Sequence, residues 1–257
     1  AGSTIARATL HNIDEIRRKN VRVGDTIVVH KAGDVIPEVV GPVLEKRPAG
    51  AVEWNMPAHC PACGSPVVND EGEVAYRCVS MDCPAQTKER LLHWVSRGCM
   101  DVDGLGEEIV DKMLEAGLVR DVSDFYKLSV EDIATLDTGR FYSAANAKRG
   151  IEAGDPIPVG AKTATKIHDE LEKSKQQPLG RVLFALGIRH VGKSVGEVIA
   201  AKFPSIDALI AAQEEDIAEI DGIGPKIAAS VRQFLAVPEN LEVIERLRSA
   251  GFPLEDN

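Results

Sequence analysis

Four cysteines stand in two short-spaced pairs, and cysteine thiolates are strong metal ligands. Cys60 and Cys63 form C-x2-C, and after fourteen residues Cys78 and Cys83 form C-x4-C. Two such pairs can close a tetrahedron around Zn²⁺, and Gly64 follows the first pair where its turn needs a permissive residue. Two disulfides are the competing interpretation, which an intracellular setting disfavours. Because all four positions are protein ligands, we expect the zinc to be structural, with no open place for a substrate.

A second pattern is a glycine that returns every 32 residues, at Gly160, Gly192 and Gly224. Each glycine is followed by a small residue at the fourth place and an apolar residue at the seventh: Ala164, Gly196 and Ala228, then Ile167, Ile199 and Val231. Self-similarity at a fixed period predicts a repeated helix, turn and helix unit. Gly104-Leu105-Gly106 is an earlier, less regular copy.

Such a unit can bind an anion, because the first backbone N–H groups of its second helix point outward. A duplex phosphate is the commonest large anion that tandem helix starts meet, as in the helix-hairpin-helix motif. Residues 102–106 and 220–224 carry a full glycine pair, whereas Pro158 and His190 replace the first glycine in the other copies. Neither pair follows a strand or continues into Gly-x-Gly-x-x-Gly, which argues against a dinucleotide fold. Helical repeat packing without a DNA role stays open.

These residues must be positioned by two kinds of segment. Alternating apolar residues predict strands over residues 21–44, with turns at Gly24-Asp25 and Gly33-Asp34, and residues 47–57 read as a linker. From about residue 86 to residue 251 the pattern is helical, with Cys99 expected as a buried free thiol after an amphipathic helix. The clearest helical spacing covers residues 109–114, 182–186, 206–211 and 241–247. Residues 138–158 break this pattern as a loop or insertion that the sequence does not place.

Charge and hydropathy limit the kinds of ligand and the location that we expect for the protein. The formal net charge of -10 argues against a broad phosphate-binding face. Residues 160–202 nevertheless hold eight Lys or Arg against four acids, a balance of 8 - 4 = +4, so binding through amides and a few placed cations is allowed. The sequence holds no apolar run long enough to span a bilayer and no signal peptide. We therefore expect a soluble cytoplasmic protein that does not enter a membrane.

The order of motifs resembles the C-terminal half of bacterial NAD-dependent DNA ligases over essentially the whole chain. The resemblance is carried by residues 6–12 (Ala-Arg-Ala-Thr-Leu-His-Asn), Gly24-Asp25, residues 32–37 (Ala-Gly-Asp-Val-Ile-Pro), the four cysteines with Cys83-Pro84-Ala85-Gln86, residues 100–106 and the later hairpins. It implies a multidomain protein with a partial all-β OB fold at 1–50, a four-cysteine zinc finger at 57–86 and an all-α helix-hairpin-helix domain with four copies at 87–257.

The resemblance also implies the DNA-binding residues. Lys31, Val35 and Ile36 would lie on the OB surface near the nick, and the family more often has Arg where Lys31 stands, which would alter its phosphate contact. Hairpin amides would be presented to phosphates by Gly104, Gly106, Gly192, Gly222 and Gly224. The implied partners are nicked duplex DNA and the ligase's own adenylation domain, in a monomer without sequence preference.

Two departures from the family shape the expectation. The 257 residues contain no Lys-x-Asp-Gly, the nucleotidyl-acceptor motif, and the chain opens inside the OB fold. We therefore expect no catalytic residue here, with NAD and Mg²⁺ acting only through the adenylation domain of a parent ligase that serves replication and repair. Two alternatives stay open: a stand-alone, non-catalytic DNA repair scaffold, and a zinc-stabilised interaction module that never touches DNA.

Overall fold

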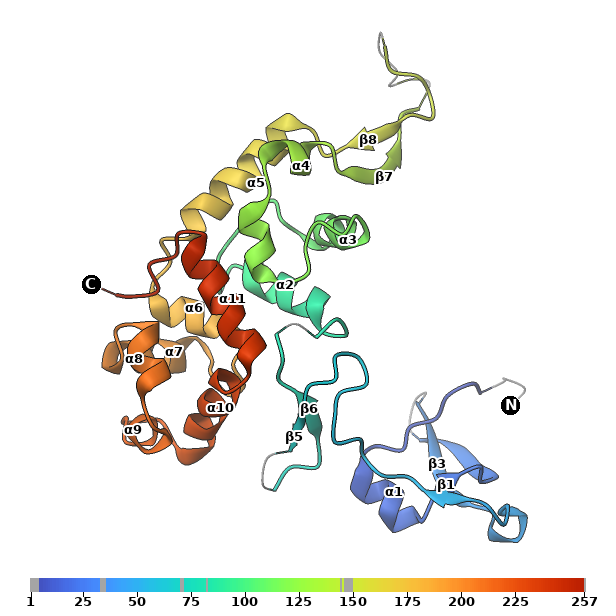
Figure 1. The fold of residues 1–257 in the computed structure, drawn as a ribbon. Helices are drawn as coiled ribbons and strands as arrows, with labels where there is room; N and C mark the ends of the chain where they lie inside the picture. The colour runs from blue at the N-terminus through green and yellow to red at the C-terminus, as the bar shows by residue number, and fades with distance from the viewer. Residues whose placement is uncertain are drawn as a thin grey trace. The chain divides into compact units, whose positions relative to one another are not determined.

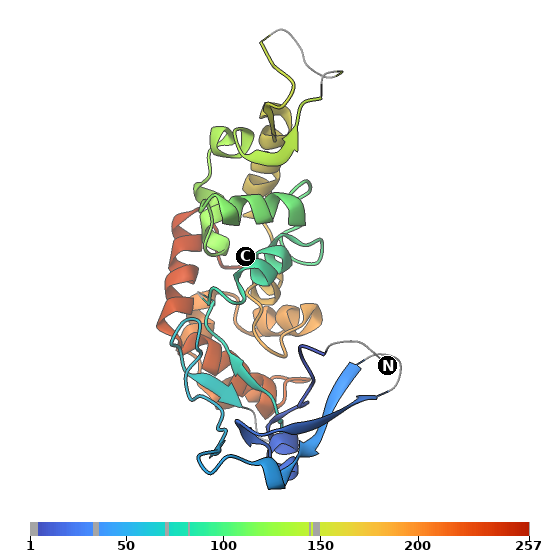
Figure 2. The same cartoon turned by 90° about the vertical axis from the view of Figure 1, so that its right-hand side faces the viewer.

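The computed structural model describes residues 5–32, 36–69, 72–81, 83–143, 145 and 150–256, and the chain divides into two compact units (Figures 1 and 2). Unit 1 comprises residues 1–78 and unit 2 comprises residues 79–257. Within the described part of the chain, every helix is too short or too polar to cross a membrane.

Unit 1 is built from a short helix and antiparallel strand pairs. Helix α1 (Ile13–Lys19) begins at Asn12, whose side chain accepts from the Glu15 amide at 3.0 Å. Strand β2 (Ile27–Ala32) pairs with β3 (Ile36–Pro42), β1 (Arg22–Val23) pairs with β4 (Val52–Glu53), and η1 (Leu44–Lys46) follows β3. Strands over residues 21–44 are therefore confirmed in the described part, and the turn predicted at Gly33-Asp34 lies outside it.

The sequence predicted a linker over residues 47–57, and this prediction is wrong for the first half of the segment. That half belongs to the fold of unit 1. The Arg47 side chain donates to both carboxylate oxygens of Asp25, at 2.8 and 2.9 Å, and the Asp25 side chain is almost fully buried. Val52 and Glu53 then form β4 against β1. A composition rich in Pro and Ala gives no local signal for this strand pairing.

A β-hairpin near the end of unit 1 carries part of the cysteine module. Strand β5 (Val67–Asn69) pairs with β6 (Tyr76–Cys78), which sets Cys78 opposite Val67. The boundary of the two units falls directly after Cys78.

Unit 2 is helical and is built largely from consecutive helix pairs, as Figure 1 shows. Its helices are α2 (Thr87–Val95), α3 (Glu107–Glu115), η2 (Val122–Lys127), α4 (Val130–Ala134), α5 (Ala161–Ser174), α6 (Leu179–Ala185), α7 (Lys193–Lys202), α8 (Ile206–Ala211), α9 (Glu214–Ala218), α10 (Pro225–Leu235) and α11 (Pro238–Ser249). Four pairs pack together: α2 with α3, α4 with α5, α6 with α7, and α9 with α10. The four helical segments with the clearest spacing are confirmed.

The repeated small and apolar positions face the core of unit 2. Ala164, Gly196 and Ala228 are buried, as are Ile167, Ile199 and Val231. Gly196 lies so close to Gly180 of α6 that a Cβ on either glycine would clash with backbone of the other helix. Cys99 is also fully buried, as expected of a structural thiol.

The segment that the sequence did not place is an insertion between α4 and α5. Strand β7 (Asp137–Phe141) pairs antiparallel with β8 (Pro156–Pro158), and the resulting hairpin extends from the α4 and α5 pair in Figure 1. The other three helix pairs carry a short turn at this place.

Candidate metal centre and nucleic-acid interface

The thiols of Cys60, Cys63, Cys78 and Cys83 all lie within 4.8 Å of one another. Four sulfurs at 2.3 Å from a central Zn²⁺ would be separated by about 3.8 Å, so the set fits a tetrahedral ion. Cys60 and Cys83 are buried, and the other two are half-buried. The four residues would fill every coordination position, which suits a structural rather than a catalytic zinc.

The local backbone explains how the first pair converges. The Gly64 amide donates to the Cys60 carbonyl and the Cys60 amide donates to the Ser65 carbonyl, both at 2.8 Å. Gly64 has φ of +76°, the left-handed conformation that the tight turn requires. Burial acts to raise the pKa of Cys63, but hydrogen bonds with Ser65, Cys78 and Cys60 together outweigh it and lower the pKa to about 7. The thiolate that a metal needs is therefore accessible near neutral pH.

Three of the four helix pairs are joined by the same turn. In each, the amide of the fourth residue donates to the carbonyl of the first: Leu105 to Val102, Val191 to Ile188, and Ile223 to Ile220, at 3.3, 3.0 and 2.9 Å. These are type II turns, whose third residue takes positive φ. Gly104 and Gly222 occupy that place, with φ of +93° and +82°.

His190 fills the same place in the turn between α6 and α7. Its φ is +64°, although the sequence set this copy apart because it lacks the first glycine. Histidine is among the residues enriched in the left-handed region. The informative feature in the sequence is the pair of apolar residues that anchors each turn, Ile188 and Val191 here, both buried.

The second glycine of each turn has a different task. Gly106, Gly192 and Gly224 are the N-caps of α3, α7 and α10, with extended backbone and no side chain to accept from the first-turn amides. A Cβ built on any of the three meets no atom within 4 Å. The fold therefore leaves the start of each helix open to an anion.

The copy around Gly160 departs from the others. Gly160 opens α5 as expected, but with φ of +83°, and the β7 and β8 insertion replaces the turn before it. Pro158 lies at the end of β8 rather than in a turn.

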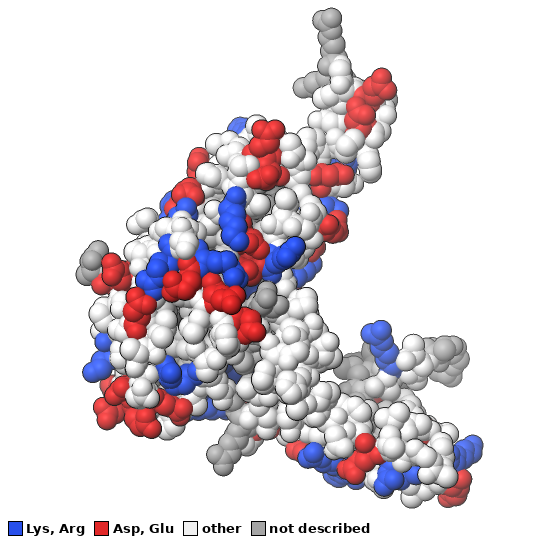
Figure 3. All heavy atoms as spheres, viewed as in Figure 1, with Lys and Arg blue, Asp and Glu red and all other residues white. Residues whose placement is uncertain are grey.

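Charge around the helix starts is mixed. Lys162, Lys193 and Lys226 stand within two residues of the N-caps of α5, α7 and α10. Acids fill the first turn of α9, and the face drawn in Figure 3 shows Lys and Arg interspersed with Asp and Glu. This suits a few local phosphate contacts better than a broad cationic surface.

The predicted OB residues are only partly described. Ile36 begins β3 opposite Ala32 and is 66% exposed. The backbone of Lys31 lies in β2 opposite Pro37, and Val35 lies outside the described residues. The structure brings the four cysteines together, whereas the glycines remain in separate turns.

Family comparisons match three parts of the chain. An NAD-dependent DNA ligase OB-fold domain matches residues 1–51, an NAD-dependent DNA ligase C4 zinc finger domain matches residues 59–85, and a helix-hairpin-helix motif matches residues 181–244. The zinc finger match and the geometry of the thiols agree on a structural Zn²⁺ held by the four cysteines.

Curated relatives match along nearly the whole chain. A DNA ligase of Halothermothrix orenii is 46% identical over 99% of this chain, and one of Parasynechococcus marenigrum is 44% identical over all of it. A DNA ligase of Chlorobaculum parvum is 43% identical over 99%. The chain spans 35% of the length of each relative. It belongs to the NAD-dependent DNA ligase family and carries that family's OB-fold, zinc-finger and helix-hairpin-helix segments.

Proposed function

We propose that this chain is the DNA-gripping part of an NAD-dependent DNA ligase that seals nicks in duplex DNA. The observation that carries the proposal is the repeated type II turn with an open N-cap glycine, which occurs at the start of α3, α7 and α10. Amides at a helix start bind phosphate oxygens and read no base, so binding is independent of sequence.

The glycines of the turns have separate roles in this proposal. Gly106, Gly192 and Gly224 let a phosphate approach the first-turn amides, while Gly104 and Gly222 hold the turn in its left-handed conformation. On the OB segment, Lys31, Val35 and Ile36 contact the duplex near the nick.

The whole ligase would supply the chemistry that this chain does not. In the reaction we propose for the parent enzyme, a lysine of the adenylation domain takes AMP from NAD and releases nicotinamide mononucleotide. The AMP passes to the 5′-phosphate at the nick, and the 3′-hydroxyl then displaces it to join the strand, with Mg²⁺ at the adenylation domain. The present chain holds the duplex against that domain, as one part of a monomer that works on DNA in the cytoplasm.

The test is fluorescence anisotropy of this chain on a nicked duplex and on an intact duplex of the same sequence, across a salt series. We expect binding to both that weakens modestly with salt, because few cations are placed at the turns. A preference for the nicked duplex would assign part of nick sensing to this chain. Absence of binding at low salt would contradict the proposal.

A further inference from the structure

The first helix pair, α2 and α3, is called the first motif here, and the pair of α4 and α5 is the second. The first motif differs from the pairs of α6 with α7 and α9 with α10 in the charge at the start of its second helix. After Gly106, α3 begins with Glu107 and Glu108, whereas α7 begins with Lys193 and α10 has Lys226 in its first turn. Carboxylates at a helix N-terminus stabilise the helix, because their charge interacts favourably with the helix dipole. They also repel a phosphate that approaches the same amides, so the first motif needs compensation if it is to bind DNA.

Each of these two carboxylates is held by a cation from another element. Lys88 of α2 lies 2.9 Å from Glu107 and 2.8 Å from Asp111, and these partners, Asp111 first, raise the pKa of Lys88. Arg140 of β7 donates through Nη2 to both carboxylate oxygens of Glu108, at 2.7 and 2.8 Å. The first motif therefore takes one cation from its own first helix, α2, and one from the insertion.

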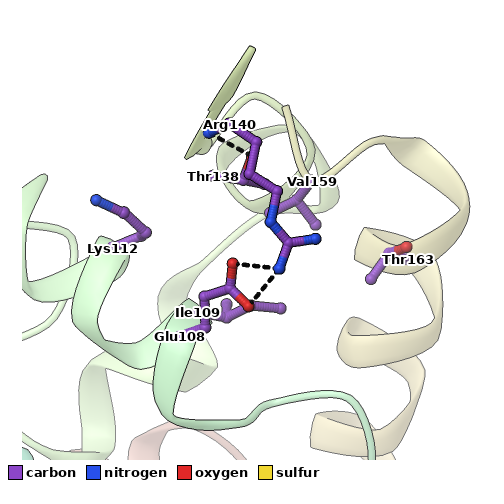
Figure 4. A pocket seen from close by; sticks show the side chains of 7 residues that line it. All are labelled: Glu108, Ile109, Lys112, Thr138, Arg140, Val159 and Thr163. Atoms are coloured by element: carbon purple, nitrogen blue, oxygen red, sulfur yellow. Dashed lines mark hydrogen bonds and ion pairs between the residues drawn. The ribbon is translucent and has the colours of Figure 1, made fainter. Parts of the chain in front are cut away.

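The inserted hairpin is built to direct Arg140 at Glu108. Gly139 takes φ of +75° and its amide donates to Asp137 at 2.8 Å, while the Thr138 hydroxyl donates to the Ile157 carbonyl at 2.6 Å. Figure 4 shows Arg140 pointing from the hairpin to Glu108, on the wall of a pocket of about 150 Å³ that Thr163 of α5 also lines.

The ion pair between Arg140 and Glu108 contributes little to the stability of the fold. The Arg140 and Glu108 side chains are 67% and 56% exposed, and pairs this exposed contribute little to stability. Its main effect is therefore on the charge around the start of α3, where Arg140 offsets the Glu108 carboxylate.

We propose that the inserted hairpin serves the first motif: Arg140 neutralises Glu108 and thereby keeps the start of α3 acceptable to a DNA phosphate. The inference rests on the proposed function and deepens it, because it gives a task to an insertion that interrupts the second motif. Arg140 is a positioning residue that acts through Glu108.

The test compares R140A, E108Q and the double variant by anisotropy on nicked duplex at low salt. R140A should bind roughly threefold to fivefold more weakly, because it leaves one uncompensated carboxylate beside the phosphate site. The double variant is neutral at both positions, so its affinity for the nicked duplex should lie within twofold of the affinity of the unmodified chain. Lys127→Ala, which removes the same charge from an exposed pair with Asp124 in η2, is the control and should change binding less than R140A. Thermal melting should be unchanged in all four.

Three outcomes would overturn the inference. If R140A binds as tightly as the unmodified chain, or no more weakly than the control, Arg140 has no specific effect on the first motif. If the double variant stays as weak as R140A, Arg140 contacts DNA itself instead of acting through Glu108. If the unmodified chain binds neither duplex, the proposed function fails as well, which separates that failure from the first two.

Discussion

At the scale of single residues, glycine has two separable tasks in the hairpins. Gly222 has φ of +82°, so any L side chain there strains the turn, whereas Gly224 has extended backbone and open space before its Cβ position. The fold favours glycine at the first place, which a side chain can occupy only in the left-handed conformation, as His190 does. The second is required only if something outside the chain approaches the helix start.

Gly224→Val should therefore leave the fold intact and weaken DNA binding several-fold, since the new side chain occupies the approach to the amides of α10. Gly222→Ala should instead destabilise the chain by about 1 to 3 kcal/mol. Urea denaturation measures the second effect and anisotropy the first. Ala236→Val, at the exposed C-terminal end of α10, is the matched control. Equal binding by Gly224→Val and the control would argue against phosphate contact at this hairpin.

At the scale of elements, α11 is hydrogen-bonded to the segment between Cys78 and Cys83, the last two of the four zinc ligands. Asn240 is fully buried, and its Oδ1 accepts from the Met81 amide at 2.7 Å. Its Nδ2 donates to the carbonyls of Phe234 and Val79, at 2.8 and 3.3 Å. One side chain thus satisfies three backbone groups, two of them in the segment that leads to Cys83.

Asn240→Ala should cost about 3 kcal/mol of unfolding free energy, because buried partners lose their hydrogen bonds. It should also speed the transfer of zinc to a coloured chelator, since the backbone before Cys83 loses its anchor. Val243→Ala, in the core face of the same helix, should cost a comparable amount while it leaves the hydrogen bonds of Asn240 in place. If both variants release zinc at the same rate, Asn240 has no specific link to the metal centre.

The ion pair of Asp25 and Arg47 makes unit 1 sensitive to acid. Hydrogen bonds from Arg47 hold the pKa of the Asp25 carboxyl below its usual value. A carboxyl with a lower pKa in the folded state contributes its stability above the ordinary pKa, near 4, and loses it as the pH falls through the folded value.

Unit 1 should therefore lose stability as the pH falls below about 4, and Asp25→Asn should be less stable at neutral pH but less dependent on pH. Amide hydrogen exchange at Ile16 and Val39, whose N–H groups donate to the carbonyls of Asn12 and Thr9, follows the change. Asp14→Asn, at an exposed acid in the first turn of α1, provides the comparison. An unchanged pH profile in Asp25→Asn would assign the acid sensitivity to another group.

At the scale of the molecule, local patterns in the sequence predicted the helices, the strands and the four thiols, because periodicity and spacing act over a few residues. The sequence did not reveal that His190 takes the place of the first glycine with φ of +64°, because a histidine gives no local signal of positive φ. Contacts over long separations were beyond prediction: Arg140 meets Glu108 across 32 residues and Asn240 meets Met81 across 159. Such pairs depend on how helices pack, which no single segment encodes.

The whole-molecule prediction is that this chain restores nick sealing to a separately produced adenylation domain of a related ligase. The chain supplies duplex binding and the other domain supplies the adenylated lysine, so the two in mixture should seal a nick faster than either alone. A gel assay of joined strands measures the rate, and Gly224→Val at equal concentration should reduce the rescue while Ala236→Val should not. DNA binding without rescue would favour a stand-alone repair scaffold. Absence of both would favour an interaction module held together by zinc.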